Sequence, residues 1–177
     1  MKKAVFLDRD GVIHEDFGYV YKKEDFCFKE GIFEFCRHAR EADYLIFIVT
    51  NQAGIARGYY TEDNFNELTR WMLQEFKDRD IDIDKVYYCP YHPTKGIGNY
   101  KQESFNRKPN PGMLLQAKEE FDIDLVDSIL VGDKESDMES GRSAGIGKLF
   151  FVCGRYEIEN AKDVRKVTDI LDIVQYL

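Results

Sequence analysis

The chain has 177 residues, of which 44% are hydrophobic and 14% are aromatic, and its formal net charge is −8. This length and hydrophobic content predict one globular domain over residues 1–177, with little disorder. The negative charge argues against nucleic acid or an anionic membrane as the main partner, while a local basic pocket for an anion stays compatible with it.

Neither a signal peptide nor a membrane span is expected. The longest apolar runs, at 45–49 and 149–152, are too short to cross a bilayer. The four cysteines lie far apart and form no closely spaced pair: Cys27, Cys36, Cys89 and Cys153. We therefore expect reduced thiols in a cytoplasmic protein.

Short apolar runs alternate with helical patterns along the chain. Nearly continuous apolar runs predict strands buried on both faces, at 4–8, 45–50, 85–89, 128–132 and 148–152. Helices are predicted between and after them, at 31–42, 61–77, 111–121, 136–144 and 168–176. Thr61 suits a helix N-cap and Pro111 suits a first helical turn. The alternation predicts an α/β fold with three α/β/α layers and a mainly parallel sheet.

Polar side chains follow the predicted strands at the carboxyl end of each. Asp8 and Asp10 follow the first strand, Thr50 ends the second, and Asp133 follows the fourth. The long irregular segment 90–110, after the third strand, leads to Lys108, and a loop of this length is usually functional. Ligands bind at this edge of an open α/β sheet. Converging carboxylates require a cation, and Mg²⁺ with a lysine and a hydroxyl makes a site for phosphoryl transfer.

These residues resemble the four motifs of the haloacid dehalogenase-like (HAD) phosphohydrolases, at 6–12, 49–51, 108–109 and 132–137. The resemblance implies a Rossmann-like fold, with Asp8 as the nucleophile that forms an aspartyl-phosphate. It implies that Asp10 is the general acid for the leaving group and then the base for water. It also implies that Thr50 and Lys108 stabilise the phosphoryl group. Mg²⁺ would be held by the carboxylates of Asp8 and Asp133 and the main-chain carbonyl of Asp10.

Within that family, the stretches 18–20, 50–58, 88–90 and 107–113 resemble D-glycero-D-manno-heptose-1,7-bisphosphate 7-phosphatases. This implies removal of the 7-phosphate in the synthesis of nucleotide-activated heptose for lipopolysaccharide or capsule, by an enzyme without a large cap domain. Arg107 suits the second phosphate because a guanidinium binds phosphate bidentately. The residues expected to bind substrate are Asp16, Tyr19, Thr50, Asn51, Gln52, Arg57, Arg107, Lys108 and Lys134.

The segment 90–110 departs from the family, whose members commonly hold structural zinc there. Cys89 keeps the first ligand position, whereas Tyr91, Ser104 and Asn106 occupy the other three. Even with His92 as a substitute only two ligands exist, and structural zinc requires four. We expect no zinc. The loop is expected either to be ordered by packing of its aromatic side chains, Tyr91, Tyr100 and Phe105, or to be mobile until substrate binds.

Several alternatives stay open at this stage. The same motifs fit a histidinol-phosphate phosphatase or a phosphatase of another small sugar or polyol phosphate. A phosphomutase and a non-catalytic phosphate-binding module are further alternatives. The sequence is compatible with a monomer but does not fix the oligomeric state.

Single residues have two interpretations each. Arg57 either binds substrate or pairs with a surface acid, and Asp137 either supports the site or is an acidic residue of a first helical turn. His14 and His38 are interpreted as ordinary surface or partly buried histidines.

Overall fold

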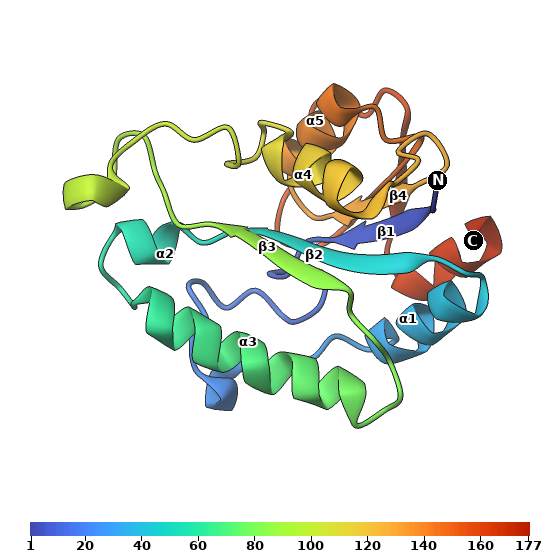
Figure 1. The fold of residues 1–177 in the computed structure, drawn as a ribbon, viewed down its shortest axis with the longest axis horizontal. Helices are drawn as coiled ribbons and strands as arrows, with labels where there is room; N and C mark the ends of the chain where they lie inside the picture. Colours follow the sequence, from blue (N-terminus) through green and yellow to red (C-terminus); the bar gives the residue numbers. More distant parts are fainter.

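The computed structural model describes residues 1–177, and its centre is a sheet of six parallel strands (Figure 1). Their order across the sheet is β3-β2-β1-β4-β5-β6, so the chain reverses its direction of travel between β1 and β4. This is the three-layer Rossmann-like α/β fold that was expected. The strands are β1 (Ala4–Leu7), β2 (Leu45–Asn51), β3 (Lys85–Cys89), β4 (Ile129–Gly132), β5 (Lys148–Val152) and β6 (Val164–Val167).

Helices cover both faces of the sheet. Figure 1 shows α4 and α5 on one face, and α1, α3 and the C-terminal segment on the other. The helices are α1 (Ile32–Glu41), α2 (Ala53–Ala56), α3 (Glu62–Lys77), α4 (Gly112–Phe121) and α5 (Glu135–Ala144), and the 3₁₀ helices are η1 (Lys23–Asp25), η2 (Gly98–Tyr100) and η3 (Ile170–Tyr176). No helix is long and apolar enough to span a bilayer.

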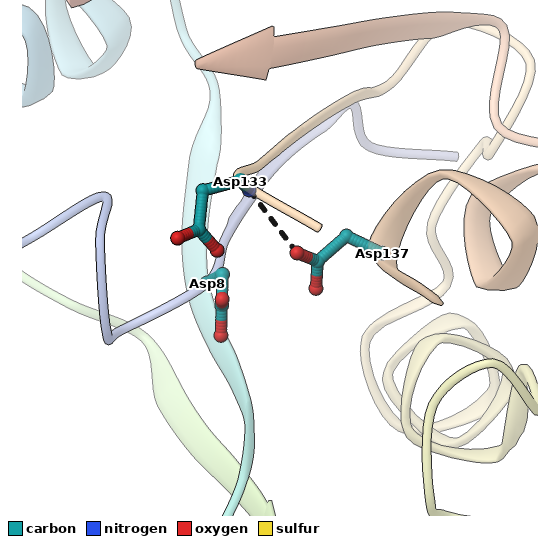
Figure 2. Close-up of side chains that lie close together, drawn as sticks. All are labelled: Asp8, Asp133 and Asp137. Atoms are coloured by element: carbon teal, nitrogen blue, oxygen red, sulfur yellow. Dashed lines mark hydrogen bonds between the residues drawn. The ribbon is translucent and has the colours of Figure 1, made fainter. Parts of the chain in front are cut away.

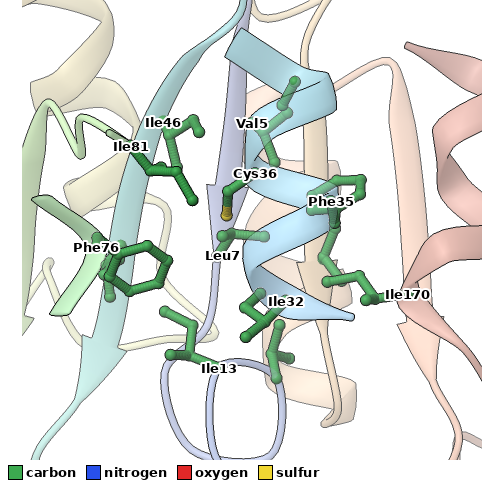
Figure 3. Packing of buried hydrophobic residues seen from close by; sticks show 14 of the residues in the cluster. Val5, Leu7, Ile13, Ile32, Phe35, Cys36, Ile46, Phe76, Ile81 and Ile170 are labelled. Carbon is green, nitrogen blue, oxygen red and sulfur yellow. The ribbon is translucent and has the colours of Figure 1, made fainter. Parts of the chain in front are cut away.

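Alternate side chains of β1 enter two separate hydrophobic clusters. Val5 and Leu7 pack with residues of α1, α3 and η3, such as Phe76, in the cluster shown in Figure 3. Ala4 and Phe6 point to the opposite face and pack against α4 and α5. Burying a side chain of this size contributes about 1.5–3 kcal/mol, so both faces fix the central strand firmly. The end of β1 is therefore a rigid base for the residues that follow it.

Thr61 is the N-cap of α3, as its position in the sequence predicts. The Thr61 hydroxyl accepts a hydrogen bond from the Asn64 backbone N–H at 3.1 Å, and the Asn64 side chain accepts one from the Thr61 N–H at 2.9 Å. This capping box satisfies two backbone donors that the first helical turn leaves free. The helix accordingly begins at Glu62.

The C-terminal part of the chain differs from the prediction. The edge strand β6 was missed because its central residues, Arg165 and Lys166, are exposed and charged. Such charges on an edge strand oppose sheet-to-sheet aggregation, and they also hide the apolar pattern of a strand. The predicted last helix at 168–176 is the 3₁₀ helix η3, in which Ile170 and Ile173 are buried three residues apart, matching the 3₁₀ repeat.

Candidate active site

A cavity of about 510 Å³ opens at the carboxyl edge of the sheet, where β1 and β4 meet. Side chains that follow β1, β2 and β4 line it, together with the end of the segment 90–110. All residues expected to bind substrate lie on its wall except Thr50, which is fully buried. The place agrees with the rule that open α/β sheets bind ligands where the strand order reverses.

Three aspartates converge beneath the cavity (Figure 2). Carboxylate oxygens of Asp8, Asp133 and Asp137 all lie within 4.8 Å of one another. Asp137 accepts hydrogen bonds from the backbone N–H groups of Asp133 (3.1 Å) and Lys134 (3.0 Å). It therefore caps the first turn of α5 and fixes the loop after β4, so both interpretations of this residue hold.

Lys108 joins this cluster from the opposite side. Its Nζ donates to Asp8 Oδ1 at 2.8 Å, to Asp137 Oδ1 at 2.6 Å and to the Val49 carbonyl at 2.9 Å. These contacts use all three N–H donors of the buried ammonium group. Burial disfavours the charge, but the neighbouring Asp137 and Asp8 outweigh it and raise the pKa of Lys108 above its usual value. The side chain is thus a fixed positive charge.

The acidic cluster holds three carboxyl groups, more than the single cation of Lys108 can balance. Burial, together with the charges of Asp8 and Asp137, raises the pKa of Asp133 to about 9. Burial and Asp137 likewise raise the pKa of Asp8 to about 6, against the opposing effect of Lys108. The buried Asp133 Oδ1 has no hydrogen-bond partner. Hard oxygen donors that are crowded in this way fit Mg²⁺.

Gly11 makes room for this arrangement. Its backbone has φ +87°, and a Cβ atom there would lie 2.0 Å from Asp133 Oδ2. A residue with a side chain would therefore be strained and would also displace the aspartate. The glycine of the first motif thus leaves the space that the carboxylate of Asp133 occupies.

Asp10 lies in a different environment from the other acids. Arg9, which is fully buried, donates to both of its carboxylate oxygens at 3.1 and 3.0 Å, and Gln52 Nε2 donates at 3.1 Å. His14 Nε2 lies 3.2 Å from Asp10 Oδ1. Burial acts to raise the pKa of Asp10, yet Arg9 and His14 hold it below its usual range. The carboxylate is therefore ionised and held in a fixed orientation.

The supporting roles of Arg9 and His14 were missed in the sequence. His14 was interpreted as an ordinary surface or partly buried histidine, but it is fully buried beside Asp10, whereas His38 is on the surface. Arg9 also donates to the Val20 carbonyl at 2.9 Å, which ties the first motif to the segment after it. An arginine directly between two aspartates at the end of a buried strand was the available signal for Arg9, and nothing in the sequence marks His14.

The second motif holds the other motifs in place. The Asn51 side chain exchanges two hydrogen bonds of 3.0 Å with the backbone N–H and carbonyl of Lys108. Gln52 donates to Thr50 Oγ1 at 2.8 Å as well as to Asp10, and its own carbonyl accepts from the Tyr60 hydroxyl. The amides of Asn51 and Gln52 are thus committed to protein groups, although both residues line the cavity.

Cations form another part of the cavity wall. Arg57 and Arg107 contribute guanidinium groups, and Lys134 contributes an ammonium group. Arg107 Nη1 donates one hydrogen bond, to the Tyr91 carbonyl at 3.2 Å, and the Arg57 guanidinium lies 5.7 Å from the ring centroid of Tyr19. Several N–H donors stay available, so the wall fits an anionic ligand.

The segment 90–110 is irregular apart from η2, and Glu62 of α3 orders it. The two Glu62 oxygens accept hydrogen bonds from the hydroxyls of Tyr88 (2.6 Å) and Tyr100 (2.7 Å). The rings of Tyr91 and Tyr100 lie 6.1 Å apart, as the packing hypothesis requires. The part of that hypothesis that concerns Phe105 is wrong, because 62% of this residue is exposed.

Known proteins share both the sequence and the shape of this chain. Residues 105–176 match the family model described as HAD-hydrolase-like. The chain is 55% identical over 153 residues, 86% of its length and 81% of the relative's, to a D-glycero-alpha-D-manno-heptose-1,7-bisphosphate 7-phosphatase of Burkholderia mallei. It is 45% identical over 179 residues to the D-glycero-beta-D-manno-heptose-1,7-bisphosphate 7-phosphatase of Vibrio cholerae, with 99% and 96% covered.

A solved structure agrees with these relatives. The crystal structure of the D,D-heptose 1,7-bisphosphate phosphatase from B. bronchiseptica, complexed with magnesium and phosphate, superposes with a TM-score of 0.81. The two chains are 25% identical, and the match covers 98% of this chain and 96% of the other.

Proposed function

Since the chain belongs to the D-glycero-D-manno-heptose-1,7-bisphosphate 7-phosphatase family of HAD-like hydrolases, we propose that it removes the 7-phosphate of such a heptose bisphosphate. The enzyme is a phosphoric monoester hydrolase, and its substrate is a small phosphorylated sugar. The observation that carries the proposal is the buried Lys108 between Asp8 and Asp137, with Asp10 beside them. In this proposal residues 1–177 form one domain that carries these site residues.

Asp8 is the nucleophile in this proposal. One of its carboxylate oxygens attacks phosphorus, and the bond from phosphorus to the sugar oxygen breaks, which leaves an aspartyl-phosphate. Lys108, 2.8 Å from Asp8, and the Thr50 hydroxyl stabilise the charge of the transferring group. Bound Mg²⁺ would be held by the carboxylates of Asp8 and Asp133 and the Asp10 carbonyl, and would neutralise charge on the phosphate and the carboxylates.

Asp10 transfers protons in both steps. In the first step it gives a proton to the departing sugar oxygen, and in the second it takes one from the water that hydrolyses the aspartyl-phosphate. The low pKa of Asp10 keeps the carboxylate ionised, as the second role requires, although it also makes the group a weak base. For the first role, the negative charge of an entering phosphate raises that pKa and favours uptake of a proton.

The function is tested by phosphate release at fixed Mg²⁺ from both anomers of heptose 1,7-bisphosphate, histidinol phosphate and several hexose bisphosphates. We expect kcat/KM for one heptose anomer to exceed that for the other classes by about 10-fold or more. Relatives are named for either anomer, and the ratio between the two assigns this chain's preference. A preference for histidinol phosphate or a flat profile contradicts the proposed substrate. Conversion of substrate without free phosphate indicates a mutase, and no turnover indicates a binding module.

We further propose that the segment 90–110 folds without zinc and that Glu62 takes over the ordering role. The Glu62→Ala variant is expected to lose about 1–3 kcal/mol of stability because two tyrosine hydroxyls lose their acceptor. Thermal unfolding measures this loss, and Asp63→Ala is the matched control, because Asp63 is an exposed acid in the same helical turn. Metal analysis should find no stoichiometric zinc; one zinc per chain, or equal stability losses in both variants, contradicts the proposal.

A further inference from the structure

The segment 153–163, which links β5 to β6, reaches the cavity although no motif in the sequence predicts that it does. Two of its residues, Arg155 and Tyr156, line the cavity. Neither belongs to a motif, and both lie in a polar stretch without regular structure. Besides the residues that follow β2 and β4, the wall of the site thus contains the flap after β1 (residues 16–19), the segment 90–110 and this C-terminal segment.

Helix α5 holds the segment 153–163 in place at several points. The Glu135 carboxylate accepts hydrogen bonds from the backbone N–H groups of Glu159 (2.7 Å) and Asn160 (3.2 Å). Arg142 Nη2 donates to the carbonyls of Asn160 (2.6 Å) and Lys162 (2.9 Å). Because α5 begins at Glu135 and carries Asp137, which binds the Asp133 N–H, the segment is fixed to the same helix that supports Asp133.

Tyr156 and Arg155 both contact Asp16 in the flap after β1. The Tyr156 hydroxyl lies 3.3 Å from Asp16 Oδ2 and donates to it, and Arg155 Nη1 donates to the Asp16 carbonyl at 3.3 Å. The other carboxylate oxygen of Asp16 accepts from the Gly18 N–H at 3.0 Å, and 9% of the side chain is exposed. The carboxylate of Asp16 therefore has a fixed orientation at the cavity wall.

The ring of Tyr156 contacts a second wall residue. Lys134 Nζ lies 4.8 Å from the centroid of this ring, a cation–π arrangement. Tyr156 thus touches an anionic acceptor through its hydroxyl and a cationic donor through its ring face. No other residue of the segment 153–163 has both contacts.

The other acids of the cavity belong to the catalytic cluster. Asp8 and Asp137 bind Lys108, and Asp10 binds Arg9 and Gln52. Among the carboxylates that line the cavity, Asp16 is the one outside this catalytic cluster. A sugar carries several hydroxyl donors beside its phosphates, and an oriented carboxylate is a strong acceptor for them. Arginine and lysine side chains supply donors for the phosphates.

From these contacts we propose that Tyr156 is a specificity-determining residue that acts by positioning Asp16 and Lys134 around a polyhydroxylated phosphate ester. This inference rests on the proposed phosphatase function and extends it to a residue outside the motifs. Tyr156 itself takes no part in the phosphoryl transfer. Its loss weakens the binding of a sugar phosphate and leaves a simple aryl phosphate, which has no hydroxyls for Asp16, unaffected.

The test compares the heptose bisphosphate with p-nitrophenyl phosphate in the Tyr156→Phe variant, which keeps the ring beside Lys134 and removes the hydroxyl. We expect kcat/KM for the heptose bisphosphate to fall about 10-fold, mainly through KM, while kcat/KM for p-nitrophenyl phosphate changes less than about twofold. The matched control is Tyr176→Phe, which removes a hydroxyl far from the cavity and should change neither value.

A double variant separates positioning from direct contact. If Tyr156 acts through Asp16, Tyr156→Phe combined with Asp16→Asn loses no more sugar-phosphate activity than Asp16→Asn alone. Additive losses overturn the inference, as does an equal loss for both substrates or no loss for either.

Failure of the proposed function has a different result, in which the wild type does not prefer the heptose bisphosphate. The ratio of kcat/KM for the polyol phosphate that the wild type prefers to kcat/KM for p-nitrophenyl phosphate is then measured. A lower ratio in Tyr156→Phe than in the wild type supports the inference. An unchanged ratio, or a wild type without any preference among polyol phosphates, overturns it.

Discussion

Replacing Asp8 by asparagine is expected to lower kcat by about 10⁴-fold or more while the fold is kept. The amide oxygen of asparagine still accepts hydrogen bonds from the Arg9 N–H and from Lys108, which hold Asp8 Oδ1 at 2.9 and 2.8 Å. An amide is not a nucleophile toward phosphorus, however, so no covalent intermediate forms. Steady-state phosphate release at saturating Mg²⁺ measures the loss.

Two controls accompany the Asp8→Asn measurement. The melting temperature should be unchanged or higher, because the substitution removes one of three crowded carboxylates. Asp82→Asn, an exposed acid paired with Lys77 on the surface, should keep wild-type activity. If kcat of the Asp8→Asn variant lies within about 10-fold of the wild-type value, Asp8 is not the nucleophile.

Replacing Lys108 by methionine is expected to reduce both activity and stability. The substitution removes a fixed charge near the transferring phosphoryl group, which lowers kcat by about 10³-fold. It also leaves Asp8 and Asp137 buried without their shared cation, at a cost of about 3–5 kcal/mol. Denaturant unfolding and phosphate release measure the two effects separately.

The double variant Lys108→Met with Asp137→Asn further separates the loss of activity from the loss of stability. Removing one of the unpaired charges should recover part of the lost stability without recovering activity, because the transferring group still lacks its cation. Lys77→Met, which breaks an exposed ion pair, is the control and should leave stability almost unchanged. Full activity in the double variant would mean that Lys108 only balances charge in the resting enzyme.

Most of the fold could be predicted because its strands are buried on both faces. The apolar runs that became β1 to β5 are nearly continuous, and Thr61 marks the start of α3 unambiguously. The pattern fails at the edge of the sheet, where β6 exposes Arg165 and Lys166. It also fails for α2, which has four residues and takes its position from the second motif. The other edge strand, β3, was predicted because its run of Val86, Tyr87, Tyr88 and Cys89 is still apolar. Short elements and strands with exposed charged residues depend on tertiary contacts that no local pattern encodes.

The site could be predicted in part, because a motif indicates which residues converge but not what holds them. Asp8, Lys108 and Asp133 lie together as the resemblance implied. The pairing of Asp10 with Arg9 and His14 is local in sequence but depends on the burial of the Arg9 and His14 side chains, whereas the contact of Tyr156 with Asp16 joins segments 140 residues apart. Their partners are chosen by three-dimensional packing, so the sequence gives little sign of them.

The strand order also determines when the enzyme can become active during its synthesis. β1 is made first and pairs with β2 on one side, but its other neighbour, β4, is more than a hundred residues later, where Val5 pairs with Ile129. Chains fold from the N-terminus as they leave the ribosome, at about 5–20 residues per second. Until β4 and α5 emerge, one side of the central strand has no partner, and Asp8 has neither Asp133 nor Asp137 nearby. We therefore expect a partly synthesised chain not to hydrolyse phosphate esters, and catalysis to begin only once the segment from β4 onward has emerged and folded.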